Sequence, residues 1–172
     1  MKKLFCFFAL VVLLFTSFTG CEIEPAPKIK EGRFNFSINY EEWGDVKTVS
    51  GVFVCKYAGR SFTLEGGGFT REYEGHVEGV ENLHETFYAT VCVGETDDGG
   101  EILLSLGVFA AHFMGEPDFA DSVIEPYLYI AYSSEDNLSC EMSDDPEVIQ
   151  GVYGLKIIDY HYDKPIKNSF GK

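Results

Sequence analysis

Basic side chains are scarce in this 172-residue sequence, which has 13 lysine and arginine residues against 28 aspartate and glutamate residues. Two of the basic residues, Lys2 and Lys3, belong to the first 20 positions, which contain no acid. Residues 21–172 therefore carry 11 basic and 28 acidic side chains, a formal net charge of −17. Such a surface repels phosphate backbones and anionic lipid headgroups, so we expect no nucleic-acid partner and no membrane attachment through charge.

The sequence also lacks the short motifs that mark common catalytic and metal centres. Its four histidines are scattered, and no two of them have the His-x-x-x-His spacing of helical zinc proteases. The glycine run at residues 66–68 is not followed by the lysine and hydroxyl residue of a phosphate-binding loop. We therefore predict no metal site, no cofactor and no catalytic residue.

Acidic residues gather in two predicted loops, which raises the question of calcium. The first group is Asp97, Asp98 and Glu101, and the second is Glu135, Asp136, Glu141, Asp144, Asp145 and Glu147. Calcium takes about six to eight oxygen ligands, but neither group follows the Asp-x-Asp-x-Asp-Gly order of an EF-hand. We interpret the first group as a hairpin turn and the second as a solvated loop with a helix cap.

No apolar run is long enough to cross a membrane as a helix. The run at residues 4–18 has 15 positions, whereas a spanning helix needs about 20. It follows Lys2 and Lys3 and is succeeded by Thr19 and Gly20. A basic start, a short apolar run and small residues at its end are typical of a secretory signal peptide.

The last residues of this segment, Phe18-Thr19-Gly20-Cys21, resemble the lipobox of bacterial lipoproteins. The resemblance implies that residues 1–20 are removed as a signal peptide and that the thiol of Cys21 receives a diacylglyceryl group. It also implies an extracytoplasmic protein held on the cell membrane by its lipid. Two acyl chains anchor a protein stably, whereas one chain holds it only marginally. We therefore expect Cys21 to be the lipid attachment site and the bilayer to be a partner.

Residues 21–31 differ in character from the chain that follows. Pro25 and Pro27 favour an extended, solvated backbone, and charged residues are frequent in this stretch. We predict a lipid-anchored linker that lifts the domain about 30 Å from the membrane, at about 3.1 Å per extended residue. The alternative is that Ile23 and Ile29 dock onto the domain.

Residues 32–172 have the length of one domain and the patterns of antiparallel strands. In residues 33–40 apolar and polar side chains alternate, which predicts a strand with one wet face. Residues 46–57 are apolar on both faces and predict a central strand, whereas residues 71–80 predict an edge strand. The Asp-Asp-Gly-Gly sequence at 97–100 predicts a hairpin turn. The other predicted strands are residues 61–65, 85–94, 101–113, 123–133 and 153–162, with a hairpin loop at 58–60.

These patterns predict an all-β fold, a single antiparallel β-sandwich or barrel-like domain with at most one short helix. Seven or eight short strands with turns between them are typical of such domains, and strand–helix alternation for a parallel sheet is missing. The short helix is predicted from Asp145 as its cap and Pro146 at its first position, with Gly151 as its end.

A second resemblance concerns the domain itself. Phe34 and Phe36, residues 52–57 and the tail at residues 165–170 are together similar to a group of small lipoproteins of Gram-positive bacteria. This resemblance would span most of residues 21–172. The group has no assigned activity, so the resemblance supports the fold and implies no function.

Three cysteines remain besides Cys21 and Cys6, which lies in the signal segment: Cys55, Cys92 and Cys140. Outside the cytoplasm a pair can oxidise, and Cys55 and Cys92 both lie in predicted inner strands, where a bridge between sheets is one option. The odd count leaves at least one thiol free, and a free cysteine packs as a small apolar residue. We expect no nucleophilic cysteine, because no family signature surrounds any of the three.

Trp43 is the sole tryptophan and falls in a predicted turn. Aromatic rings with polar edges stack on sugars and serve as contacts in protein interfaces. The leading hypothesis is a non-catalytic, surface-tethered module that binds a glycan or another envelope protein through Trp43. In the alternative, Trp43 covers a strand end and the tyrosines fill the rim of the domain.

A different function remains open in the sequence, that of a small glycan-directed envelope hydrolase. It would use two Asp or Glu residues that converge across a cleft, one of them with a raised pKa. The sequence does not pair any two of its 28 acids, so it identifies no candidate for either role.

Overall fold

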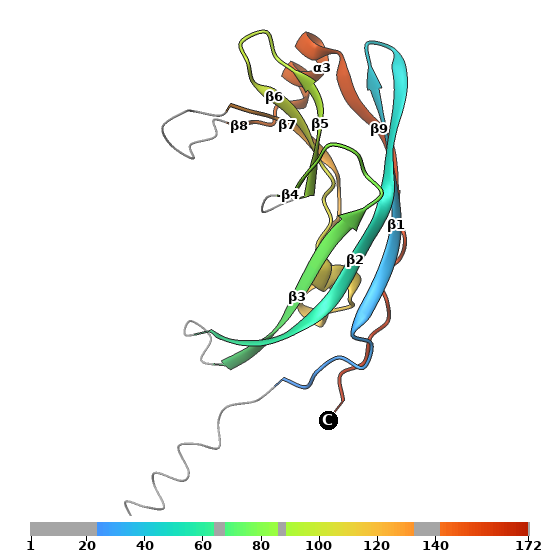
Figure 1. Cartoon of the computed structure of the whole chain (residues 1–172), viewed down its shortest axis with the longest axis vertical. Coiled ribbons are helices and arrows are strands. Elements are labelled where there is room, and N and C mark those ends of the chain that lie inside the picture. The colour runs from blue at the N-terminus through green and yellow to red at the C-terminus, as the bar shows by residue number, and fades with distance from the viewer. Residues whose placement is uncertain (1–23, 64–67, 86–88, 133–141, 172) are drawn as a thin grey trace, which may run out of the picture.

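The computed structural model describes residues 24–63, 68–85, 89–132 and 142–171, which form two antiparallel sheets (Figure 1). The first sheet has the strand order β3-β2-β1-β9. Its strands are β1 (Glu31–Glu42), β2 (Asp45–Thr63), β3 (Gly68–Glu78) and β9 (Leu155–Tyr162). As predicted, residues 46–57 belong to a central strand, and residues 71–78 belong to an edge strand.

The second sheet has the order β4-β5-β6-β7-β8, so its strands pair in the order in which the chain makes them. They are β4 (Leu83–Glu85), β5 (Ala89–Glu95), β6 (Glu101–Ser105), β7 (Tyr127–Ala131) and β8 (Met142–Ser143). The predicted turn at 97–100 joins β5 to β6, with Glu95 opposite Glu101. Short helices accompany the sheets: α2 (Ala110–Phe113), the 3-10 turn η1 (Pro117–Phe119) and α3 (Pro146–Tyr153).

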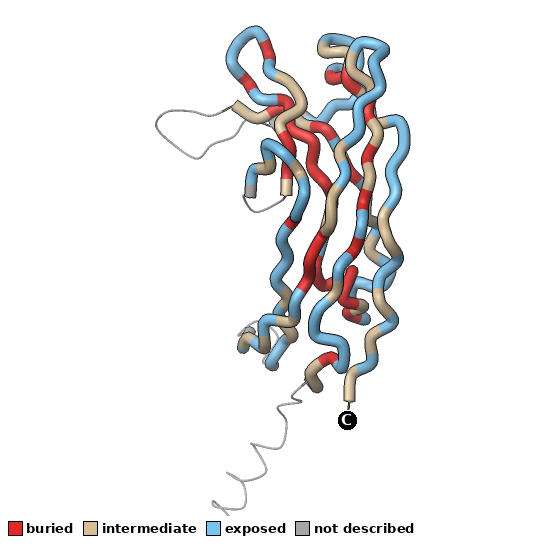
Figure 2. The backbone as a smooth tube through the Cα atoms, turned by 45° about the vertical axis from the view of Figure 1, so that its right-hand side comes forward, coloured by how far each residue is buried: buried red, intermediate tan, exposed pale blue. Residues whose placement is uncertain are grey.

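The two sheets share one apolar core, which makes the arrangement sandwich-like and confirms the predicted all-β class. Strand β1 alternates as predicted, with Phe34, Phe36, Ile38 and Tyr40 buried. The second sheet contributes buried residues from β5, β6 and β7, and the helices contribute Phe113 and Ile149. Figure 2 shows these buried stretches along the strands, with exposed residues on the outer surface and hairpin tips.

Several predicted boundaries are wrong, and two of them change the course of the chain. Residues 58–60 are not a hairpin loop, because β2 continues through them to Thr63 and absorbs one extra residue in a register shift between Tyr57 and Gly59. The strand predicted at 101–113 ends at Ser105. Gly107 has φ +63°, a left-handed conformation that turns the chain, and the following apolar residues form helix α2.

Helix α3 begins where the sequence predicts and ends later. The Asp145 side chain accepts a hydrogen bond from the Glu147 N–H at 2.9 Å, and Pro146 occupies the first turn. The predicted end at Gly151 is wrong, because the helix continues to Tyr153 and stops at Gly154. Gly154 has φ +65°, and a Cβ atom there would lie 2.5 Å from the Trp43 ring. Both the conformation and the space at this position require glycine.

Gly154 and Gly151 offer a matched pair of substitutions. Gly154→Ala should lower the free energy of unfolding by about 1–2 kcal/mol, because it combines a left-handed alanine with a clash against Trp43. Gly151→Ala should raise it by about 0.5–1 kcal/mol, since Gly151 lies within the helix and faces open space. Urea unfolding of both variants measures the difference. Equal effects would contradict the assignment of the helix end to Gly154.

In the described part of residues 21–31, the segment is docked on the domain and is not a free spacer. Pro27 is buried and pairs with Phe170 in an isolated antiparallel bridge, and Glu31 already belongs to β1. The Lys28 N–H donates to the Ser169 carbonyl at 3.0 Å, and Asn168 exchanges hydrogen bonds with both backbone groups of Ile29. The partner that holds this segment is therefore the C-terminal tail, which no local pattern links to it. We call residues 24–30 and 165–171 together the basal clasp.

Candidate functional site

The turn that carries Trp43 is a two-residue hairpin. Glu42 pairs with Asp45 across the end of β1 and β2, and the two residues between them have φ +52° (Trp43) and +93° (Gly44). Asparagine, aspartate and glycine are favoured in such a turn, because both of its central residues are left-handed. A bulky side chain there costs about 1–2 kcal/mol. Trp43 thus occupies its place against the local conformational preference.

The Trp43 side chain is held on one side and open on the other. Its backbone N–H donates to the Gly154 carbonyl at 3.0 Å, and its ring lies against the Cα of Gly154. Even so, 72% of the residue is exposed. The structure therefore combines the two interpretations of Trp43, since the ring covers the end of α3 and still presents a free surface.

A cleft of about 260 Å³ opens beside this ring, and we call it the distal cleft. Four segments meet in it: the β1/β2 turn, the β5/β6 hairpin, the end of α3 and the start of β9. Its lining residues are Glu42, Trp43, Gly94, Glu95, Asp97, Ile102, Val152, Tyr153 and Leu155. Figure 1 shows these segments at the end of the molecule opposite to residue 24 and the C-terminal tail.

Three of the lining side chains are carboxylates, and none of the lining side chains is basic. Glu42 also pairs with Lys47, and this hydrogen bond raises the pKa of the lysine. Glu95 and Asp97 come from the β5/β6 hairpin. The cleft therefore presents an apolar aromatic face beside several oxygen acceptors.

The β5/β6 hairpin is fixed by hydrogen bonds within it. Gly100 N–H donates to the buried hydroxyl of Thr96 at 2.7 Å, and that hydroxyl donates to Asp98. The Thr96 hydrogen bond lowers the pKa of Asp98, which also accepts from the Tyr132 hydroxyl at 3.3 Å. Asp98 is thus committed to the turn, and its neighbour Asp97 lines the cleft.

A second cleft, of about 360 Å³, lies between β7, α3 and β9 and is called the lateral cleft here. Its lining residues are Pro126, Tyr127, Leu128, Asp144, Pro146, Ile149, Gln150, Leu155, Lys156 and Ile157. Apolar side chains predominate in it. It has no tryptophan, and Asp144 and Lys156 provide one acid and one base.

Other tyrosines in the described part of the chain lie at the rim of the domain or on its surface. The Tyr162 hydroxyl donates to the Leu106 carbonyl at 2.7 Å from a half-buried position, in keeping with a rim residue. Tyr127 and Tyr160 are 45% and 42% exposed. Neither of these lines the distal cleft; of the described tyrosines, only Tyr153 does so.

The two cysteines of the described strands form no disulfide and are not activated as nucleophiles. Cys55 in β2 and Cys92 in β5 are both free, so the structure does not contain the disulfide that the sequence left open. Burial raises the pKa of Cys55 to about 12, which disfavours the nucleophilic thiolate. Cys140 lies outside the described residues.

Among the described residues, no three His, Cys, Asp or Glu side chains converge on a point that would suit a metal ion. Within the second acidic group, Asp145 caps α3, whereas Glu135, Asp136 and Glu141 lie outside the described residues. In the part of the chain that the structure describes, the carboxyl groups with shifted pKa values are Glu78, Asp98 and Glu116, and all three are shifted downward. A glycosidase acid needs the opposite shift.

The grouping of Glu42, Glu95 and Asp97 around Trp43 has no counterpart in the sequence analysis. In the sequence, Asp97 belongs to an acidic group that is weighed for calcium and interpreted as a hairpin turn, and no pattern points to Glu42 or Glu95. The one available signal was the tryptophan in a turn, because Glu95 and Asp97 come from a hairpin more than 50 positions away.

Comparisons with known proteins supply no further identification. No family model, no curated protein and no solved structure matches the chain. Within the described ranges, no helix has both the length and the apolar character needed to cross a membrane.

Proposed function

We propose that this chain is a lipid-anchored, extracytoplasmic binding module that holds a glycan in the distal cleft. The ligand would be a sugar chain that is uncharged or carries amino groups. The observation that carries the proposal is the exposed Trp43 ring, set in a strained turn beside a cleft with three carboxylates.

The chemistry of the distal cleft supports this ligand class. An open tryptophan face stacks on the apolar face of a sugar ring, and carboxylate oxygens accept hydrogen bonds from its hydroxyl groups. An amino sugar would add a charge-assisted hydrogen bond. Phosphorylated or uronic-acid sugars would meet Glu42, Glu95 and Asp97 with like charge. The strained conformation of Trp43 is the kind of local cost that is found at functional positions.

The position of the distal cleft suits a tethered protein. The basal clasp places residue 24 at the opposite end of the molecule (Figure 1). An anchor at Cys21 would then leave the distal cleft facing away from the membrane. The acidic surface of residues 21–172 would also keep the exported domain soluble.

Trp43 provides its own assay, because it is the only tryptophan in the chain. A lipid-free form that begins at Cys21→Ser should change its fluorescence on titration with neutral or amino-bearing oligosaccharides. Trp43→Ala should weaken binding at least about tenfold, equivalent to about 1.4 kcal/mol, because the stacking surface is removed. Because this variant has no tryptophan, its sugar affinity is measured by the rise of its melting temperature with sugar concentration.

Tyr127→Ala is the matched control, because Tyr127 is exposed and lines the lateral cleft. It should bind the sugar as the parent does. Trp43→Ala should change the free energy of unfolding by less than about 1 kcal/mol, since most of the side chain is exposed and alanine keeps the Cβ atom in the same turn conformation. Unchanged sugar affinity in Trp43→Ala would contradict the site. No response to any sugar would favour an envelope protein as the partner.

A further inference from the structure

The far end of the β2/β3 hairpin carries an exposed aromatic pair. Phe62 and Phe69 face each other across the two strands, with ring centroids 5.3 Å apart in an edge-to-face arrangement. They are 51% and 36% exposed. Apolar side chains exposed side by side mark contact sites for a protein or a membrane.

The same hairpin binds the N-terminal segment. The Arg71 guanidinium lies 3.2 Å from the Glu24 carboxylate and donates to the Pro25 carbonyl at 3.1 Å. It also stacks over the Phe170 ring, 4.3 Å from its centroid. Arg71 thereby joins β3 to both segments of the basal clasp.

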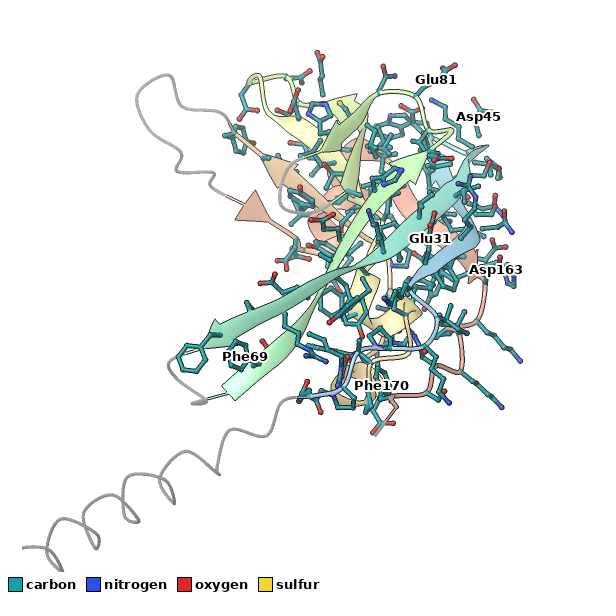
Figure 3. All side chains as sticks on the ribbon, turned by 60° about the horizontal axis from the view of Figure 1, so that its bottom comes forward. Glu31, Asp45, Phe69, Glu81, Asp163 and Phe170 are labelled. Atoms are coloured by element: carbon teal, nitrogen blue, oxygen red, sulfur yellow. The ribbon has the colours of Figure 1, made fainter. Side chains whose placement is uncertain are left out.

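The register places the aromatic pair close to the start of the described chain. Arg71 is opposite Arg60, and the Phe62–Phe69 pair lies two positions further towards the hairpin tip. Two strand residues span about 7 Å. Figure 3 shows Phe69 and Phe170 at the end of the molecule where residue 24 lies.

The distance from the lipid is equally short. Only residues 22 and 23 separate Cys21 from Glu24, so three backbone steps connect them and span at most about 11 Å. With Glu24 held by Arg71, a lipid on Cys21 keeps the hairpin tip near the membrane surface. The docked segment thus removes the 30 Å spacer that a free linker would provide.

Exposed charges of both signs lie behind the aromatic pair, with Glu31 and Glu72 among them. Arg60 is exposed on the same face of the hairpin as Phe62, because the two residues are two positions apart. The basal clasp adds the exposed Lys28, Lys30 and Lys167. Aromatic rings at the tip with cations behind them match the order of acyl region and headgroups in a bilayer.

We propose that the Phe62–Phe69 pair inserts into the headgroup–acyl boundary of the bilayer as a second membrane contact. This inference rests on the lipid anchor of the proposed function. The lipid and the hairpin tip together would fix the orientation of the domain, with the distal cleft directed away from the surface.

The experiment uses the full mature lipoprotein in phosphatidylglycerol vesicles that contain brominated phosphatidylcholine. Phe62→Trp is introduced together with Trp43→Phe, so that the only tryptophan reports the tip. Its fluorescence should shift to the blue and be quenched severalfold more strongly than that of Trp43 in the parent chain. Phe69→Trp with Trp43→Phe is a second reporter at the same height, which guards against a folding defect in the first.

The possible outcomes distinguish a missing membrane contact of the aromatic pair from a missing lipid on Cys21. Mass spectrometry of the N-terminal peptide establishes the lipid on Cys21, and Cys21→Ser should abolish it. If the peptide is lipidated and both reporters are quenched no more than Trp43, the tip remains in water and the inference is overturned alone. If the parent peptide has no lipid, the anchor and the inference fall together.

Discussion

Replacing Glu116 with alanine should lower the free energy of unfolding by about 3–5 kcal/mol, because it leaves the buried Arg71 guanidinium with only the partly exposed Glu24 as a carboxylate partner. Arg71 Nε donates to Glu116 Oε2 at 2.6 Å, and Arg71 Nη2 forms a second bond to Oε1. The Tyr73 hydroxyl donates to the same carboxylate at 2.7 Å. The side chains of Arg71 and Glu116 are only 8% and 6% exposed.

An exposed ion pair between β1 and β3 provides the control. Arg33 and Glu78 form an ion pair with 56% and 45% exposed side chains. Because solvent screens such a pair, Glu78→Ala should cost less than about 1 kcal/mol. Urea unfolding compares the two variants. A loss in Glu116→Ala no larger than in Glu78→Ala would contradict a structural role for the buried network.

The Glu116 network should also make stability depend on pH. Burial alone would raise the pKa of Glu116, but the hydrogen bonds from Arg71 and Tyr73 outweigh it and the pKa is lowered. A carboxyl with a lowered folded-state pKa contributes stability above its unfolded pKa of about 4.3 and loses it as pH falls through the folded value. The stability difference between the parent and Glu116→Gln should therefore be constant at neutral pH and shrink below about pH 4. A stability difference between the two proteins that grows at low pH would contradict the lowered pKa of Glu116.

Phe113→Ala should likewise cost about 3–5 kcal/mol, the usual range for removing a fully buried aromatic ring. Phe113 is 1% exposed and contacts the rings of Phe34 and Phe53, with centroids 4.9 and 5.6 Å away. It enters the core from α2 and touches β1 and β2 of the first sheet. The cavity left behind would loosen the support of both strands.

Phe119→Ala is the appropriate comparison, since Phe119 is 37% exposed and pairs with the exposed Phe109. Its loss should cost about 1 kcal/mol or less. Thermal and urea unfolding of the two variants give the contrast. Similar values for both would mean that α2 is not a part of the core.

Local patterns were sufficient for much of the fold. The alternation of Phe34, Phe36 and Ile38 predicted one buried face of β1, and that face is buried. The Asp-Asp-Gly-Gly turn and the Asp145 cap were also predicted, because each depends on a few neighbouring residues. In these places the physical cause and the sequence signal lie within the same short stretch.

Most of the wrong predictions concern residues whose structure depends on partners far away along the chain. Residues 101–113 are apolar enough for a long strand, but Gly107 turns the chain and the core accepts Phe113 from a helix. Glu116 is buried because Arg71 meets it from 45 positions away. Pro27 is buried because the C-terminal tail covers it. For the candidate site, the sequence predicted Trp43 in its turn but not the carboxylates that the β5/β6 hairpin brings to it.

Strand β1 runs from the basal clasp to the turn of Trp43, a length of about 40 Å for its 12 residues. A mechanical pull applied at Trp43 and resisted at residue 24 would pass along this one strand. Its ladder bonds to β2 and β9 lie across the direction of that pull. The tension would be carried by covalent backbone bonds, so a tethered domain could hold a load at its outer end without unzipping its sheets.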